Sequence, residues 1–149
     1  METEIIIANK RYVGHIIKFL GKYLKSNLCI QPPWWTFPIY IRNMIDDGEI
    51  FILRCVKTHK IIGIISYLKF SRRRIPQEAE ILVLAIRKLY RNKGYGRFLV
   101  NHTLEKIQGK FQTVILGSMK DFNVKEFYLK LGFQIYEENS KSYRFLKEL

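Results

Sequence analysis

One stretch, residues 80–100, constrains the fold of this chain more than any other. It begins with an apolar run from Ile81 to Ile86 that is rich in aliphatic and β-branched residues, as buried strands are. A basic loop follows, then two glycines with one residue between them, Gly94 and Gly96, and then an amphipathic segment. The stretch therefore predicts a strand, a glycine-rich turn and a helix in direct succession.

Such a turn is suited to binding a phosphate or a pyrophosphate. Backbone N–H groups in the turn and at the start of the helix lack intrahelical partners, and the helix end carries partial positive charge. Glycine also removes the Cβ atom that would keep an anion away from the backbone. The pattern is neither a Walker loop nor the dinucleotide fingerprint, which needs a third glycine where this chain has Leu99. The alternative is a turn whose glycines serve only packing.

Two motifs carry a family resemblance. The segment Arg91-Asn92-Lys93-Gly94-Tyr95-Gly96 resembles the acyl-CoA loop of the GNAT acetyltransferases, Arg/Gln-x-x-Gly-x-Gly/Ala, and the preceding strand ends at the spacing that this family has. The segment Tyr128-Leu129-Lys130-Leu131-Gly132-Phe133 looks like the family's Tyr-x-Lys-x-Gly-Phe signature. With two separate motifs in the expected order, the chain is similar to the family over its whole length.

Hydrophobic periodicity places the other elements. Expected strands span residues 4–8, 49–56, 61–70, 78–86, 112–117, 133–136 and 143–146, and expected helices span 11–25, about 38–46, about 97–107 and 122–131. This is the GNAT order. It implies an α/β fold of the α+β type, with a mixed, mostly antiparallel central sheet of about seven strands flanked by about four helices. We expect one GNAT-type N-acetyltransferase domain over residues 1–149.

The charge of the chain favours an anionic ligand. Its 26 Lys and Arg against 13 Asp and Glu give a net charge of +13, and no acid lies between Glu80 and Glu105. Coenzyme A carries a pyrophosphate and a 3′-phosphate, which a basic surround attracts. A biased composition with a solvated basic surface is the alternative, and the run Arg72 to Arg74 is expected to be solvated. Nucleic-acid binding is the least favoured alternative, because the sequence has no recognised nucleic-acid motif.

Other features exclude several classes of protein. No run of 18 apolar residues is present, so we expect no transmembrane helix and no membrane partner. The N-terminus is unlike a secretion signal. Cys29 and Cys55 lack C-x-x-C spacing, which favours reduced thiols in a cytoplasmic protein and no metal site.

The resemblance implies acetyl-CoA as co-substrate. It implies that pantetheine hydrogen-bonds to the free strand edge at Leu84 to Ile86 and that a backbone N–H near Ile86 polarises the thioester carbonyl. Asn123 is a second choice as a ligand, because the position where the family often has asparagine is Asp121 here. The expected cofactor-binding residues are Leu84, Ile86, Arg91, Asn92, Lys93, Gly94, Tyr95, Gly96, Arg97 and Asn123.

Glu80 is the expected catalytic base. An amine such as lysine has a pKa of about 10.4, so it is mostly protonated at neutral pH and must lose a proton before it reacts. Strand alternation predicts one shared face for Glu78, Glu80, Leu82, Leu84 and Ile86. About twenty residues of this strand and loop are similar to the histone acetyltransferase branch, which puts Glu80 at the base position, acting directly or through water. The alternative is that Glu80 is an exposed strand carboxylate or pairs with a nearby arginine, and Glu78 is a second candidate for the base.

Tyr128 is the second expected catalytic residue. It matches the family's tyrosine near the CoA sulfur, where its phenol could protonate the departing thiolate. A tyrosine that only packs the last helix is the alternative.

The aromatic segment Trp34-Trp35-Thr36-Phe37 is either a lid on the core or a wall of the acceptor pocket. On the second interpretation, Trp34, Trp35 and Phe37 bind the acceptor.

The leading function is an N-acetyltransferase that transfers the acetyl group of acetyl-CoA directly to an amine of a small molecule, peptide or protein. A non-catalytic acyl-CoA-binding regulatory module is the alternative. The acceptor stays open, and so does a homodimer, which is common in the family.

Overall fold

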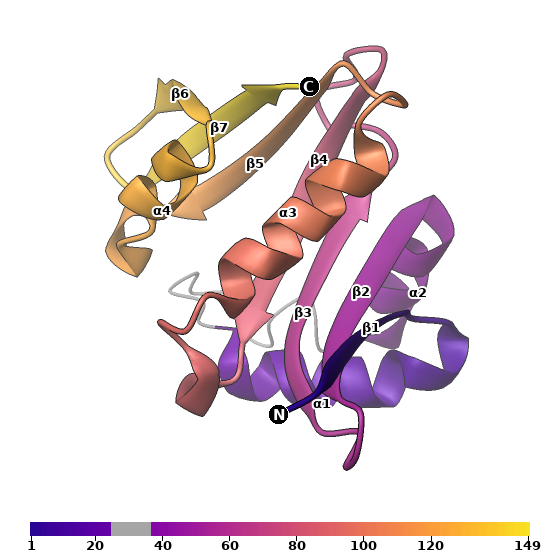
Figure 1. Ribbon diagram of the computed structural model, residues 1–149. Helices are drawn as coiled ribbons and strands as arrows, with labels where there is room; N and C mark the ends of the chain where they lie inside the picture. The colour runs from indigo at the N-terminus through magenta and orange to yellow at the C-terminus, as the bar shows by residue number, and fades with distance from the viewer. Residues whose placement is uncertain (25–36) are drawn as a thin grey trace.

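The computed structural model describes residues 1–24 and 37–149 as a single sheet with helices on both faces (Figure 1). The sheet has seven strands in the order β1-β2-β3-β4-β5-β7-β6. They are β1 (Thr3–Ile7), β2 (Gly48–Cys55), β3 (Ile61–Leu68), β4 (Glu78–Ile86), β5 (Thr113–Met119), β6 (Gln134–Glu138) and β7 (Ser142–Glu148). All neighbours in this sheet are antiparallel except β4 and β5. The expected mixed, mostly antiparallel fold is confirmed.

The helices follow the expected order; the first and last are shorter than expected, and the third begins two residues earlier. They are α1 (Val13–Tyr23), α2 (Pro38–Asp47), α3 (Tyr95–Ile107) and α4 (Lys125–Lys130), with 3₁₀ turns at Lys10–Tyr12, Lys88–Tyr90 and Lys120–Phe122. The helix expected over 122–131 is divided because Asn123 adopts a left-handed conformation, with φ 53°, after the last of these turns. Gly132, with φ 92°, follows the end of α4, as glycine commonly does after a helix C-terminus.

Each face of the sheet has its own hydrophobic core. The face beneath α3 and α4 buries large side chains such as Phe51, Phe133 and Phe145. The opposite face buries Ile16 of α1 and Ile41 of α2 against the middle strands. In Figure 1, α3 crosses the near face of the sheet, and α1 and α2 lie behind it.

The parallel pairing of β4 with β5 is short. In the described chain it joins Glu78 to Thr113 and ends where Glu80 lies opposite Ile115. Beyond this point the two strands diverge, and β4 continues beside β3 alone (Figure 1). The sheet therefore opens between β4 and β5 toward the N-terminal end of α3.

A bulge in β4 changes which side chains share a face. Ser66 of β3 pairs with Val83 and the next residue, Tyr67, pairs with Ile81, so Leu82 is an extra residue in β4. Leu82 packs with the core beneath α1 and α2, whereas Leu84 packs with the core beneath α3. The prediction of one face from Glu78 to Ile86 is therefore wrong beyond Leu82, because alternation does not persist through a bulge.

Candidate active site

A cleft of about 960 Å³ lies where β4 and β5 diverge. It is lined by β4 from Ile81 to Ile86, by the turn before α3, by the end of β5 and by the segment that leads into α4. The structure brings most of the predicted cofactor residues together here: Leu84, Ile86, Arg91, Asn92, Gly94, Gly96, Arg97 and Asn123, with Tyr128 beside them. The cleft thus joins the two sequence motifs.

Two of the expected cofactor residues lie outside the lining of this cleft. Tyr95 packs its ring edge-on against Tyr90, with ring centroids 6.0 Å apart. Lys93 is exposed, and its Nζ lies 5.9 Å from the centre of the Tyr90 ring. In the structure, both side chains contact Tyr90, which itself lines the cleft.

The turn before α3 presents backbone N–H groups. Gly94 adopts a left-handed conformation, with φ 91°, immediately before α3. The first bond of the helix runs from the Phe98 N–H to the Gly94 carbonyl oxygen at 3.0 Å. The N–H groups of Tyr95, Gly96 and Arg97 precede this bond, so they have no acceptor within the helix and are suited to an anion.

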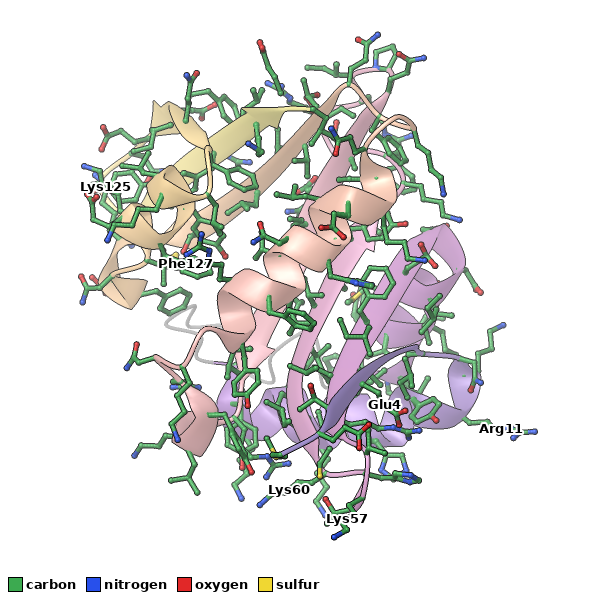
Figure 2. The ribbon with its side chains drawn as sticks, in the orientation of Figure 1. Glu4, Arg11, Lys57, Lys60, Lys125 and Phe127 are labelled. Carbon is green, nitrogen blue, oxygen red and sulfur yellow. The ribbon has the colours of Figure 1, made fainter. Side chains whose placement is uncertain are left out.

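Gly96 leaves space between the turn and α4. A Cβ atom at this position would lie 3.5 Å from the ring of Phe127, which projects from α4 on the side facing α3 (Figure 2). Because this is ordinary van der Waals contact, glycine is not needed here to avoid a clash within the protein. The space it leaves is part of the cleft, which Phe127 also lines.

The free edge of β4 also faces the cleft. The Arg87 N–H donates to the carbonyl oxygen of Ile62, on the neighbouring strand β3, at 2.8 Å. Because neighbouring residues in a strand alternate the edge to which they bond, Leu84 and Ile86 direct their backbone groups away from β3. These groups therefore point toward the side from which β5 has diverged.

Arg91 shapes the turn from within. Its Nε donates to the Ile86 carbonyl oxygen at 2.9 Å, and its Nη2 donates to the Tyr23 carbonyl oxygen at 2.9 Å. Tyr23 is the last residue of α1. The half-buried Arg91 side chain therefore joins the end of β4 to the end of α1. Arg87 supports the same junction, because its Nη1 donates to the Tyr23 hydroxyl at 2.9 Å.

Glu80 comes immediately before the part of β4 that lines the cleft. Its side chain lies on the opposite face of the sheet from that of Ile81. Its side chain is 3% exposed and is not part of the cleft lining, although the adjacent Ile81 and Leu82 are. Arg72 contacts both carboxylate oxygens: its backbone N–H donates to Oε1 at 2.8 Å, and its Nε and Nη2 donate to Oε2 at 3.0 and 2.6 Å.

Glu78 has a similar clamp. Arg73 donates from Nε to Glu78 Oε1 at 2.6 Å and from Nη2 to Oε2 at 2.7 Å, and the Thr113 hydroxyl donates to Oε2 at 2.7 Å. The Arg73 guanidinium holds the pKa of the Glu78 carboxyl below its usual range, against the opposing effect of burial. The expectation of a solvated arginine run is therefore wrong for Arg73, which is mostly buried against Glu78. Arg72 stays 67% exposed while it pairs with Glu80, so the alternative of a Glu80 paired with a nearby arginine is the arrangement that the structure has. The sequence does not indicate which arginine pairs with which carboxylate.

Tyr128 lines the cleft and is 7% exposed. Its ring packs against those of Phe127, Phe133 and Phe145, at centroid distances of 5.0, 5.7 and 5.2 Å. Burial raises the pKa of the Tyr128 phenol above its ordinary value. The phenol is therefore protonated at neutral pH and can donate a hydrogen bond.

Trp34 and Trp35, predicted to bind the acceptor, lie outside the described residues. Phe37 precedes α2, is 41% exposed, and packs edge-on against Tyr40 at a centroid distance of 6.1 Å. Its exposure is inconsistent with a place in the core.

Over residues 1–24 and 37–149, no His, Cys, Asp and Glu side chains gather in a group of three or more that could hold a metal ion. No helix in these same ranges is long and apolar enough to cross a membrane.

Comparisons with known proteins agree with the motifs. A model of the acetyltransferase (GNAT) family matches residues 23–133. No curated protein matches the sequence. Among solved structures, the PaiA N-acetyltransferase from Thermoplasma acidophilum in complex with coenzyme A has a TM-score of 0.83 at 18% identity, over 100% of each chain.

Two further structures resemble the chain. A GNAT family acetyltransferase from Staphylococcus aureus Mu50 has a TM-score of 0.79 at 17% identity, over 99% of each chain. A mutant of the SpeG spermidine N-acetyltransferase from Vibrio cholerae has a TM-score of 0.73 at 12% identity, over 98% of this chain and 93% of the other. At these identities, the likeness concerns the fold.

Proposed function

The chain belongs to the acetyltransferase (GNAT) family, and we propose that it transfers the acetyl group of acetyl-CoA directly to an amine of a small molecule, peptide or protein. The observation that most supports this proposal is the cleft between β4 and β5, which leads to the free N–H groups at the start of α3. A pyrophosphate suits the turn, and an extended pantetheine suits the free edge of β4. Acetyl-CoA, which fits these residues, supplies an acyl group activated as a thioester.

The backbone of β4 would hold and polarise the thioester. The pyrophosphate site lies beyond the end of β4 at Ile86, so pantetheine would run along β4 from Ile86 toward Glu80. The Ile86 carbonyl oxygen already accepts from Arg91, which leaves the Ile86 N–H for a pantetheine group. We therefore assign the thioester oxygen to the Leu84 N–H, which also points toward the cleft. A fixed N–H in a cleft stabilises the negative charge that develops on this oxygen during attack by the amine.

Glu80 would accept the proton that the attacking ammonium must lose. From the residues that the structure describes, its Oε1 accepts one hydrogen bond and its Oε2 accepts two, which leaves one lone pair on Oε1 for a proton. Because the side chain is almost fully buried and lies outside the cleft lining, we propose that a chain of water molecules carries the proton to Glu80. The amine nitrogen then forms its bond to the acyl carbon, and its second proton passes to solvent as the carbon–sulfur bond breaks.

Tyr128 would assist departure of the sulfur when the carbon–sulfur bond breaks. A thiol has an ordinary pKa of about 8.5. Because burial raises the pKa of the Tyr128 phenol, complete transfer of its proton to a thiolate is unfavourable. We therefore assign it a hydrogen bond to the thiolate, which takes its proton from the solvent, and expect a modest contribution to the rate.

We retain Trp34, Trp35 and Phe37 as proposed acceptor contacts. The exposed ring of Phe37 supports this for the end of the aromatic segment. Changing Trp34 or Trp35 to Ala should raise the acceptor KM much more than the acetyl-CoA KM. A large loss of thermal stability with both KM values unchanged would instead assign these rings to the core.

Calorimetry with acetyl-CoA, followed by an amine screen with labelled acetyl-CoA, tests the proposed function. Saturable binding of acetyl-CoA and transfer of the label to an amine are expected. Binding without transfer to any amine would favour an acyl-CoA-binding regulatory module. If acetyl-CoA does not bind while DNA binds with steep salt dependence, the proposal is wrong.

A further inference from the structure

We propose that Arg72 is a positioning residue for Glu80: it holds one carboxylate oxygen so that the other presents a lone pair for proton transfer. This inference rests on the proposed role of Glu80 as the base. It assigns a role in the reaction to a residue that belongs to neither sequence motif. Arg72 follows β3, and Glu80 lies eight positions later, on β4.

The hydrogen bonds divide unequally between the two oxygens of Glu80. Oε2 accepts from Nε and Nη2 of Arg72 at 3.0 and 2.6 Å, whereas Oε1, among residues 1–24 and 37–149, accepts from the Arg72 backbone N–H alone at 2.8 Å. A carboxylate has about four lone-pair sites, so, counted over these residues, one site remains, and it is on Oε1. Arg72 therefore fixes the rotation of the carboxylate and determines which oxygen is available.

Glu78 provides an internal comparison. It lies two residues earlier on β4 and on the same face, because side chains in a strand alternate. Its carboxylate accepts from Arg73 twice and from the Thr113 hydroxyl, so it accepts as many hydrogen bonds as Glu80 does. The two carboxylates differ in position. Glu78 lies where β4 is still paired with β5, whereas Glu80 lies where the two strands part.

The loop that carries Arg72 is held in place. Ser71 is fully buried, its carbonyl oxygen accepts from the Arg74 N–H at 2.9 Å, and its hydroxyl accepts from the Ile75 N–H at 3.4 Å. The Arg72 side chain is 67% exposed, whereas that of Glu80 is 3% exposed. The guanidinium thus covers the buried carboxylate from the solvent side. The guanidinium also gives this buried charge the partner that a charge removed from water requires.

Variants of the two neighbouring arginines test this inference. We would follow CoA release from acetyl-CoA with 2-phenylethylamine, lysine and a lysine-containing peptide as acceptors. Arg72→Met should lower kcat at least tenfold, within the range of general-base catalysis, and should change the pH–rate profile. The affinity for acetyl-CoA should not change. Arg72→Lys should recover part of the rate, because it restores the cation but not the two parallel bonds.

Arg73→Met is the matched control, because it breaks the neighbouring clamp on Glu78. It should lower stability and leave kcat and the pH–rate profile of the folded enzyme unchanged. Equal effects of Arg72→Met and Arg73→Met on kcat, or no effect of Arg72→Met on either kcat or the profile, would overturn the inference.

A measurement without an acceptor separates this inference from the proposed function. ¹³C NMR with carboxyl-labelled glutamate at neutral pH follows the surroundings of the Glu80 carboxylate directly, with Glu80→Gln used to assign its signal. The chemical shift of this signal should change in Arg72→Met and stay in place in Arg73→Met. If the wild-type chain transfers acetyl to none of the three amines, the proposed function loses support, and this measurement decides whether Arg72 holds Glu80. An identical Glu80 signal in all three proteins would overturn the contact itself.

Discussion

Arg91 Nε donates a hydrogen bond to the Ile86 carbonyl oxygen, 2.9 Å away, and so joins the first residue of the glycine turn to the end of β4. The same guanidinium bonds to the Tyr23 carbonyl oxygen. We predict that Arg91→Met weakens acetyl-CoA binding about tenfold, because two net hydrogen bonds of about 1 kcal/mol each hold the turn. Isothermal titration calorimetry measures this loss.

Lys88→Met controls for charge, because Lys88 is an exposed cation in the same loop. Its effect on affinity should be small and should vanish in high salt, since salt screens exposed charges. The loss in Arg91→Met should persist in high salt. Equal losses in both variants, both removed by salt, would mean that Arg91 acts only through its charge.

The two glycines of the turn should differ in their response to alanine. Gly94 has φ 91°, a conformation that costs a residue with a Cβ atom about 1–2 kcal/mol. Gly94→Ala should therefore distort the turn and weaken acetyl-CoA binding about tenfold. Calorimetry gives the affinity, and urea unfolding gives the free energy of unfolding.

Gly96→Ala is the companion variant. Its Cβ atom would make ordinary contact with Phe127 at 3.5 Å, and alanine favours a helix. The protein should therefore keep its wild-type stability or gain up to about 1 kcal/mol. If Gly94→Ala proves as stable and as strongly binding as the wild type, the conformation of residue 94 is not what the site requires.

The elements that build the cleft could be predicted from local sequence. The strand expected over 78–86 matches β4 at both ends, and a helix follows the glycine turn as expected, although α3 begins at Tyr95, two residues before the expected start. These predictions succeeded because strand alternation, glycine conformation and helix periodicity are local properties. The meeting of Gly94 with Tyr128 in one cleft followed from the family resemblance, which ordered the elements.

The rest depends on pairing between distant segments. The bulge at Leu82 arises where β3 and β4 pair, and a strand sequence does not mark it. The clamp of Arg72 on Glu80 depends on how the loop after β3 folds back over β4, and the contact of Arg91 with Tyr23 joins residues 68 positions apart. A run of arginines looks the same in a sequence whether it is solvated or paired.

Tyr128→Phe should lower kcat about threefold to tenfold, with little effect on either KM. The variant removes one hydrogen-bond donor and keeps the ring that packs against Phe133 and Phe145. Because the pKa of the phenol is raised above its ordinary value of about 10, the group stays protonated up to that pH. The alkaline limb of the pH–rate profile below pH 10 should therefore be the same in both proteins.

Tyr143→Phe provides the control, because Tyr143 lies on β7, and the cleft lining does not include it. Its kcat should equal that of the wild type. A loss in Tyr128→Phe of a hundredfold or more, or an alkaline limb that disappears with the phenol, would instead assign proton transfer to Tyr128.

The pair of Arg73 and Glu78 should stabilise the fold in a pH-dependent way. The Glu78 side chain is fully buried, and the guanidinium lowers the pKa of its carboxyl in the folded protein. A lowered pKa stabilises the fold at pH values above the ordinary glutamate pKa of about 4.3, and this contribution is lost as the pH falls further. Breaking a buried ion pair costs about 3–5 kcal/mol.

We therefore predict that Glu78→Gln lowers the free energy of unfolding by about 3 kcal/mol at pH 7, and that the difference from the wild type shrinks steadily between pH 5 and pH 3. Urea unfolding at a series of pH values measures this. Glu137→Gln is the control, because Glu137 is 66% exposed and lies 4.0 Å from Arg144, so its loss should cost less than about 1 kcal/mol at any pH. A pH-independent difference for Glu78→Gln would show that packing, rather than the charge of Glu78, holds the β3–β4 loop against the sheet.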